Sequence, residues 1–246
     1  MTDTSPLDWI ADAYGAHCLV LAKDLTGREL LLRLGAEAAD LFIPQDEDEA
    51  NAFLQEGLEN YDGPWGAARA GEADSWAFSL EPASLWGSIR ERLERASRAT
   101  EVICCSEAVG TGTVEYWQDG TLITSFDTLT PQDRSAQGLA ADPDRLVAEM
   151  RQAGFFDAAD PYPRYAPLAL LHEVTGVALS QEQTTLALSG RLPVLGLGPE
   201  GTPQPSTYED ASGRPADASG GPVGEPSRPQ RAGKAKASRG QAYTTP

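Results

Sequence analysis

Three cysteines and two histidines are the first candidates in this chain for a nucleophile, a base or a metal ligand. A cysteine nucleophile needs a nearby base or positive charge that lowers the pKa of its thiol. Cys104 and Cys105 are adjacent, and His17 and His172 are the available imidazoles. Adjacent strand residues point to opposite faces, so the two cysteines cannot serve one site together. We favour the interpretation that Cys104 and Cys105 are small buried residues of a strand. The alternative is a hydrolase or thiol-dependent enzyme whose site includes Cys104, Cys105 or His17.

The spacing of these residues matches no common metal or cofactor motif. The chain has no Cys-x-x-Cys and no His-Glu-x-x-His, the spacings that typically hold zinc. Residues 110–112 (GTG) resemble the start of a phosphate-binding loop, but the third glycine is missing and a strand, not a helix, follows. We therefore expect neither a metal nor a cofactor.

The candidate surface site consists of Trp86, Glu81 and Asp127. Glu81 and Asp127 each end a predicted strand beside aromatic residues, where a carboxylate is either solvated or available for acid–base chemistry. Trp76 follows the alternation of a strand and is predicted to be buried. Trp86 lies in a loop before a helix, so it either fills the junction or stands half exposed as a binding anchor.

Alternating apolar and polar residues predict a set of short strands that would position these side chains. The sequence Asp-Gly at 119–120, between two such runs, is a strong hairpin signal. A two-residue loop there pairs Trp117 with Leu122 and Tyr116 with Ile123. The expected strands are residues 17–22, 65–70, 75–81, 101–106, 113–117 and 121–127.

Helices are predicted towards both ends of the sequence, with the strands clustered between them. Thr26 and Ser180 each begin a capping box, with Glu29 and Gln183 three residues later. Short hairpin loops favour an antiparallel sheet. We therefore predict one α+β domain over residues 1–196, with a central, mainly antiparallel sheet of about five or six strands packed by helices.

The charge of the chain is unevenly distributed. The formal net charge is −18, and residues 1–196 hold 13 basic and 32 acidic side chains. An acidic domain is repelled on average by nucleic acid and by an anionic membrane. The charge is sufficient to explain solubility, and it also suits a protein partner with a basic surface.

Residues 197–246 form a second segment that is rich in glycine, proline and serine. Its apolar residues are too few to offset the entropy of ordering, so we predict a disordered tail. A basic end follows, which we expect to be solvated, to fold back on the domain or to contact nucleic acid weakly. The basic residues of this end are Arg228, Arg231, Lys234, Lys236 and Arg239.

The composition also indicates where the protein works. The abundance of arginine over lysine is typical of high-GC genomes and indicates a bacterial source. The acidic start, MTDTSPLDWI, lacks the apolar region of a secretory signal, and no apolar run is long enough to span a membrane. Three cysteines in apolar runs fit reduced thiols. We expect a cytoplasmic protein.

Four stretches resemble a family from high-GC bacteria, the domain of unknown function 6461: HCLVLAKDLTGRELLLRLGA, DSWAFSLEPASLWGSIRERLERAS, YWQDGTLITSFD and DPDRLVAEMRQAGF. The resemblance spans about residues 15–190. Trp86-Gly87 lacks the glutamine of the family's Trp-Gln-Gly turn, and Ala96-Ser97 replaces Leu-Ser. The resemblance implies no activity and assigns no functional residue. The leading hypothesis is a non-enzymatic interaction module with an acidic surface, such as an immunity-like or chaperone-like adaptor.

Overall fold

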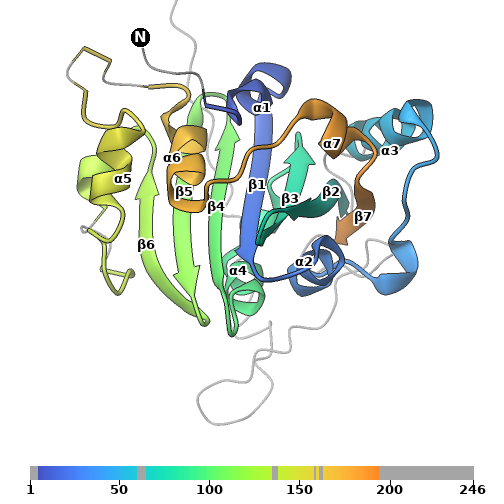
Figure 1. Cartoon of the computed structure of the whole chain (residues 1–246), viewed down its shortest axis with the longest axis horizontal. Coiled ribbons are helices and arrows are strands. Elements are labelled where there is room, and N and C mark those ends of the chain that lie inside the picture. The colour runs from blue at the N-terminus through green and yellow to red at the C-terminus, as the bar shows by residue number, and fades with distance from the viewer. Residues whose placement is uncertain (1–4, 60–64, 135–137, 158, 161–162, 194–246) are drawn as a thin grey trace, which may run out of the picture. The chain divides into compact units, whose positions relative to one another are not determined.

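The computed structural model describes residues 5–59, 65–134, 138–157, 159–160 and 163–193 (Figure 1). These residues belong to one unit of the chain, Met1–Gln204. The tail that the sequence predicts to be disordered, 197–246, lies outside the described residues.

A seven-stranded sheet forms the centre of the fold, in the order β6-β5-β4-β1-β3-β2-β7. Every neighbouring pair is antiparallel, which confirms the predicted α+β class. The strands are β1 (Ala16–Lys23), β2 (Trp65–Ala73), β3 (Trp76–Pro82), β4 (Glu101–Ala108), β5 (Thr111–Gln118), β6 (Thr121–Asp127) and β7 (Leu188–Pro193).

The edge strand β7 is the strand that the sequence does not predict. Its sequence, LSGRLP, contains a glycine and a proline, which both weaken the local strand signal. Pairing with β2 makes it a strand, with Leu188 opposite Ala70 and Pro193 opposite Trp65. A Cβ at Gly190 would displace the end of the Leu41 side chain, which packs against this strand. Tertiary packing, and not local preference, therefore forms β7.

The hairpin between β5 and β6 confirms one predicted pairing and corrects the other. Trp117 lies opposite Leu122 as expected, but Tyr116 lies opposite Thr124 and not Ile123. A register shift between Tyr116 and Trp117 causes the difference, because a bulge places an extra residue on one strand.

Helices surround the sheet, and the two predicted capping residues begin two of them. Thr26 accepts a hydrogen bond from the Glu29 amide, and Ser180 forms a complete capping box with Gln183. Among the described residues no helix is long and apolar enough to cross a membrane. The helices are α1 (Asp8–Ala13), α2 (Gly27–Leu34), α3 (Glu47–Glu59), α4 (Arg90–Ala96), α5 (Val147–Gln152), α6 (Ala166–Thr175) and α7 (Gln181–Thr185), with short 3-10 helices η1 (Ala38–Asp40), η2 (Trp86–Ser88) and η3 (Pro131–Asp133).

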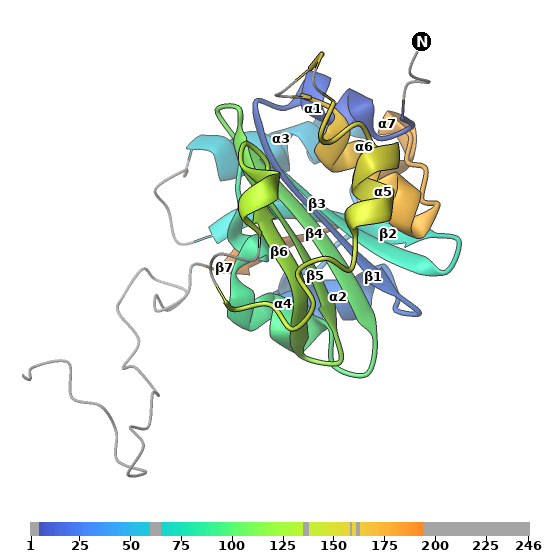
Figure 2. The same ribbon diagram turned by 90° about the vertical axis from the view of Figure 1, so that its left-hand side faces the viewer.

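The helices divide the core between the two faces of the sheet. Helices α1, α5 and α6 cover one face, here called the α6 face, where Trp76 is buried as predicted. Helices α2 and α4 cover the other, the α4 face. Figure 2 shows the sheet between α5 and α6 on one side and α2 and α4 on the other. Neighbouring residues of each central strand therefore belong to different cores.

Candidate functional site

A row of polar side chains crosses five strands on the α4 face. Cys18 of β1 pairs directly with Glu81 of β3 and with Ser106 of β4. Ser106 pairs with Thr113 of β5, which pairs with Asp127 of β6. Residues directly opposite each other in a sheet share a face, so these five form one line, which we call the polar row.

Burial changes along the polar row. Glu81 and Cys18 are 0% exposed, and Ser106 is 6% exposed. Thr113 and Asp127 are exposed. Asp127 accepts a hydrogen bond of 2.7 Å from the Leu129 amide, which stabilises the turn after β6. The row thus opens to solvent towards β6. The predicted surface site is therefore not one surface, because Glu81 is inside the protein and Asp127 is four strands away.

The Glu81 carboxylate is held by three hydrogen bonds. Oε2 accepts from the Ser84 hydroxyl at 2.6 Å and from the Trp86 amide at 3.0 Å, and Oε1 accepts from the Gly87 amide at 2.6 Å. Burial raises the pKa of Glu81 above its usual value, while the hydrogen bonds from Ser84, Gly87 and Trp86 and the charge of Arg92 partly oppose this. Glu81 therefore fixes the start of η2.

Trp86 and Gly87 fit tightly around this carboxylate. A Cβ on Gly87 would collide with Glu81 Oε1 and would lie 3.5 Å from Cys18 Sγ. A Cβ on Gly66 would meet the Trp86 ring. Trp86 is partly buried and packs against the core of the α4 face. It thus fills the junction between sheet and helix while keeping part of its ring accessible.

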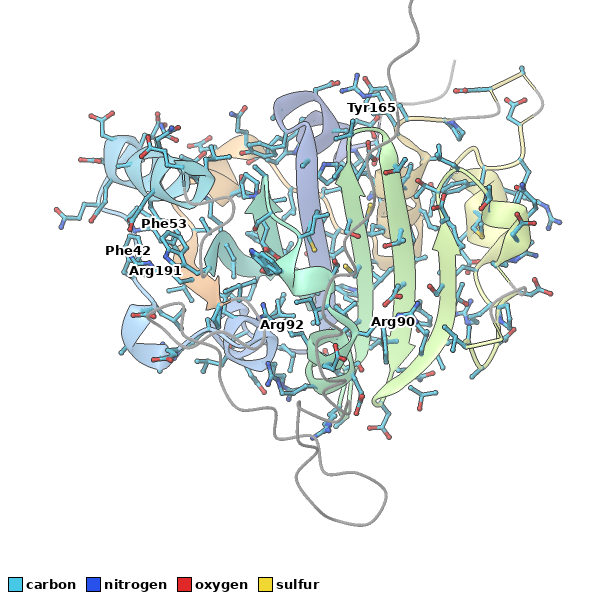
Figure 3. The ribbon with its side chains drawn as sticks, turned by 180° about the vertical axis from the view of Figure 1, so that it is seen from behind. Phe42, Phe53, Arg90, Arg92, Tyr165 and Arg191 are labelled. Atoms are coloured by element: carbon cyan, nitrogen blue, oxygen red, sulfur yellow. The ribbon has the colours of Figure 1, made fainter. Side chains whose placement is uncertain are left out.

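Arg92 is a buried cation next to the same junction (Figure 3). It donates to the Trp86 carbonyl at 3.2 Å and to the Pro193 carbonyl, which ends β7. Burial lowers its pKa, and the charge of Glu81 opposes this. Arg92 therefore joins η2 to the end of the edge strand β7.

Two thiols meet beneath η2. Cys18 Sγ and Cys104 Sγ are 3.7 Å apart and form a hydrogen bond. This hydrogen bond and burial raise the pKa of Cys18 well above its usual value. Cys105 belongs to the α6 face, as the alternation of β4 predicts. The contact between Cys18 and Cys104 could not be predicted, because the two residues are 86 positions apart in the sequence.

A charged network occupies the neighbouring row of the α4 face, two residues further along β5 than Thr113. Glu115 accepts from Arg90 Nε at 2.8 Å, from Trp117 Nε1 at 3.0 Å and from the Ser125 hydroxyl at 3.2 Å. Arg90 Nη2 also donates to Ser125 at 3.3 Å. Figure 3 shows Arg90 over the sheet beside α4. Sequence reasoning missed this network, because its members become neighbours only through strand register.

The residues of the thiol-enzyme alternative lie mainly on the α6 face. His17 pairs with Glu107, and Cys105 lies diagonally across from His17. Burial raises the pKa of Cys105 well above its usual value and lowers the pKa of His17. Both groups are therefore kept neutral, which opposes a thiolate–imidazolium pair. His172 lies elsewhere, with Nδ1 2.9 Å from the Val177 carbonyl.

The acidic residues gather at the opposite edge of the fold. Residues 37–59, here called the acidic segment, contain no lysine, arginine or histidine. Glu56 of this segment forms an ion pair with Arg191 at 3.2 Å. The segment packs inward through Phe53, which contacts Phe42 and Trp65 (Figure 3). Its exposed acidic residues are Glu37, Asp40, Asp46, Glu47, Asp48, Glu49, Glu56 and Glu59.

Within the described ranges no group of three or more histidine, cysteine, aspartate or glutamate side chains could hold a metal ion.

The comparison with family models matches residues 6–188 to a family of unknown function, DUF6461. The chain belongs to the DUF6461 family. No curated protein and no solved structure matches it significantly. The DUF6461 match covers the sheet from β1 to β6 and all the α-helices.

Proposed function

We propose that this DUF6461 domain is a non-enzymatic, cytoplasmic interaction module whose acidic segment binds a basic region of a protein partner. The observation that carries the proposal is the concentration of eight exposed carboxylates in residues 37–59, with no basic residue among them. A concentration of charge of one sign accelerates and selects association with a surface of opposite charge.

Exposed apolar side chains accompany these carboxylates. Ile43, just before α3, is 69% exposed, and Leu58 near its end is 43% exposed. Protein interfaces combine an apolar centre with a polar rim. Ile43 and Leu58 lie at the two ends of α3 and each offers apolar contact beside exposed carboxylates. A module of this kind acts by covering a basic surface of another protein, as an immunity-like inhibitor or a chaperone-like adaptor does.

Charge-reversed variants with equal net charge test this proposal. Asp48→Lys/Glu59→Lys changes the first turn and the end of α3, and Glu182→Lys/Glu173→Lys changes the first turn of α7 and the last turn of α6. The proteins captured from the producing cells by each variant and by the wild type are quantified by mass spectrometry. We expect the α3 variant to lose a basic partner at least about tenfold, the control to keep it, and salt to release it. Equal capture by all three proteins, or equal loss in both variants, would overturn the proposal.

The second candidate is a thiol-dependent enzyme on the α6 face. The observation that favours it is the common face of His17, Cys105 and Glu107. The burial of Cys105 and the neutral state of both groups oppose it. Native-state thiol labelling separates the two proposals, because an enzyme of this kind must present a reactive thiolate.

A further inference from the structure

The Cys18–Cys104 contact is a pair of free thiols without a role in the proposed interaction. Cys18 and Cys104 lie on the neighbouring antiparallel strands β1 and β4, as diagonal neighbours on the same face. Their sulfurs are 3.7 Å apart. A disulfide requires a sulfur separation of about 2.05 Å, so the sulfurs must approach by about 1.7 Å, and diagonal strand neighbours need a local backbone movement as well.

The chain covers this pair with a short, specifically anchored segment. Helix η2 lies over β1 and β4, and a Cβ at Gly87 would be 3.5 Å from Cys18 Sγ. The backbone of η2 is held by Glu81 through the Trp86 and Gly87 amides. Cys18 is 0% exposed and Cys104 is 2% exposed, so an oxidant cannot reach the sulfurs unless the segment that covers them moves.

We propose that Cys18 and Cys104 form a redox-active dithiol, which a peroxide oxidises to an intramolecular disulfide when η2 opens. The sulfur of Cys104 takes one oxygen from the peroxide, giving a sulfenic acid and one water from hydrogen peroxide. Cys18 Sγ then displaces the hydroxyl group, which leaves as a second water with the proton of the Cys18 thiol. Two thiols are oxidised to one disulfide, and the peroxide is reduced to two waters.

The position of the pair makes this product selective. Cys105 is next to Cys104 in sequence but belongs to the opposite face, so the fold separates it from Cys18. A disulfide between residues 86 positions apart constrains the unfolded chain strongly and stabilises the folded one. Oxidation of Cys18 and Cys104 therefore changes the stability of the central strands and has no part in catalysis.

Stoichiometric oxidation of the full-length protein tests the proposal. Native protein is treated with hydrogen peroxide, unfolded in acid, alkylated and weighed. We expect a product that has lost two hydrogens and takes one alkyl label, on Cys105. Cys105→Ala should form the disulfide at the wild-type rate, whereas Cys18→Ala and Cys104→Ala should form none. Three labels on treated wild type, or a disulfide that includes Cys105, would overturn it.

Two further measurements keep the test independent of whether the cysteine variants fold. The oxidised wild-type protein should retain its circular dichroism spectrum and unfold several degrees higher than its reduced form. Glu81→Gln, which weakens the attachment of η2, should speed oxidation at least about threefold, while Glu107→Gln on the other face should not. Loss of structure on oxidation, or equal rates in both glutamine variants, would contradict the proposal.

Discussion

The Glu81 carboxylate accepts a hydrogen bond of 2.6 Å from the Gly87 amide, and this contact leaves no room for a side chain at residue 87. Gly87→Ala should therefore lower the free energy of unfolding by about 2 kcal/mol, because the new Cβ displaces either the carboxylate or η2. Urea denaturation measures the change. Gly15→Ala is the matched control, since a Cβ there meets nothing within 4 Å. An equal loss in both variants would show that the Glu81 contact is unimportant.

The burial of Glu81 also predicts a dependence of stability on pH. Its folded-state pKa is raised above the usual 4.5, mainly by burial, so the native state favours the protonated carboxyl. The stabilisation is fully present below the unfolded pKa and is lost as pH rises through the folded pKa. Relative to Glu81→Gln, which does not titrate, the wild type should therefore become less stable as pH increases from about 4.5.

Urea unfolding of both proteins at a series of pH values measures this difference. Asp127→Asn, at the exposed end of the same row, keeps an oxygen for the Leu129 amide and should change stability by less than about 0.5 kcal/mol. A constant difference between wild type and Glu81→Gln across the series would mean that the folded pKa of Glu81 is not raised.

Local sequence signals predicted most elements of this fold, but not the site that they build. The caps at Thr26 and Ser180 and the turn at 119–120 depend on residues close in sequence, and all three are present. The sequence does not predict β7, because only its pairing with β2, and no local pattern, makes this segment a strand.

The polar row depends on the position of β1 between β3 and β4. That order joins segments far apart in the chain, and alternation within one strand does not determine which strand lies beside it. Glu81 was singled out as a strand-end carboxylate, yet its partners on η2 and its complete burial follow from this tertiary arrangement.

The Glu115 network predicts a second stability effect. Glu115→Ala removes the acceptor of Arg90, Trp117 and Ser125 together, and should cost about 1–2 kcal/mol, mainly because the buried Trp117 Nε1 is left unpaired, whereas the partly exposed Arg90 can turn to water. Tryptophan fluorescence during urea unfolding measures the change. Glu91→Ala, an exposed neighbour of Arg90, should change stability by less than about 0.5 kcal/mol. Comparable costs for the two variants would argue against the network.

Native-state labelling provides the test of the thiol-enzyme alternative. All three cysteines are buried, so a maleimide reagent should label none of them rapidly in the folded protein and all three after denaturation. Mass spectrometry counts the labels. Rapid, selective labelling of Cys105 in the native state, abolished by His17→Ala, would instead support a catalytic thiol on the α6 face.

The position at which a protein partner contacts the domain tests the proposed function most directly, and photo-crosslinking measures it. A photo-crosslinking amino acid is introduced at Ile43, 69% exposed within the acidic segment, and separately at Val109, 93% exposed at the tip between β4 and β5. We predict that irradiation in the producing cells joins a basic protein to position 43 and not to position 109. No crosslink at 43, or equal crosslinks at both, would contradict the role of the acidic segment.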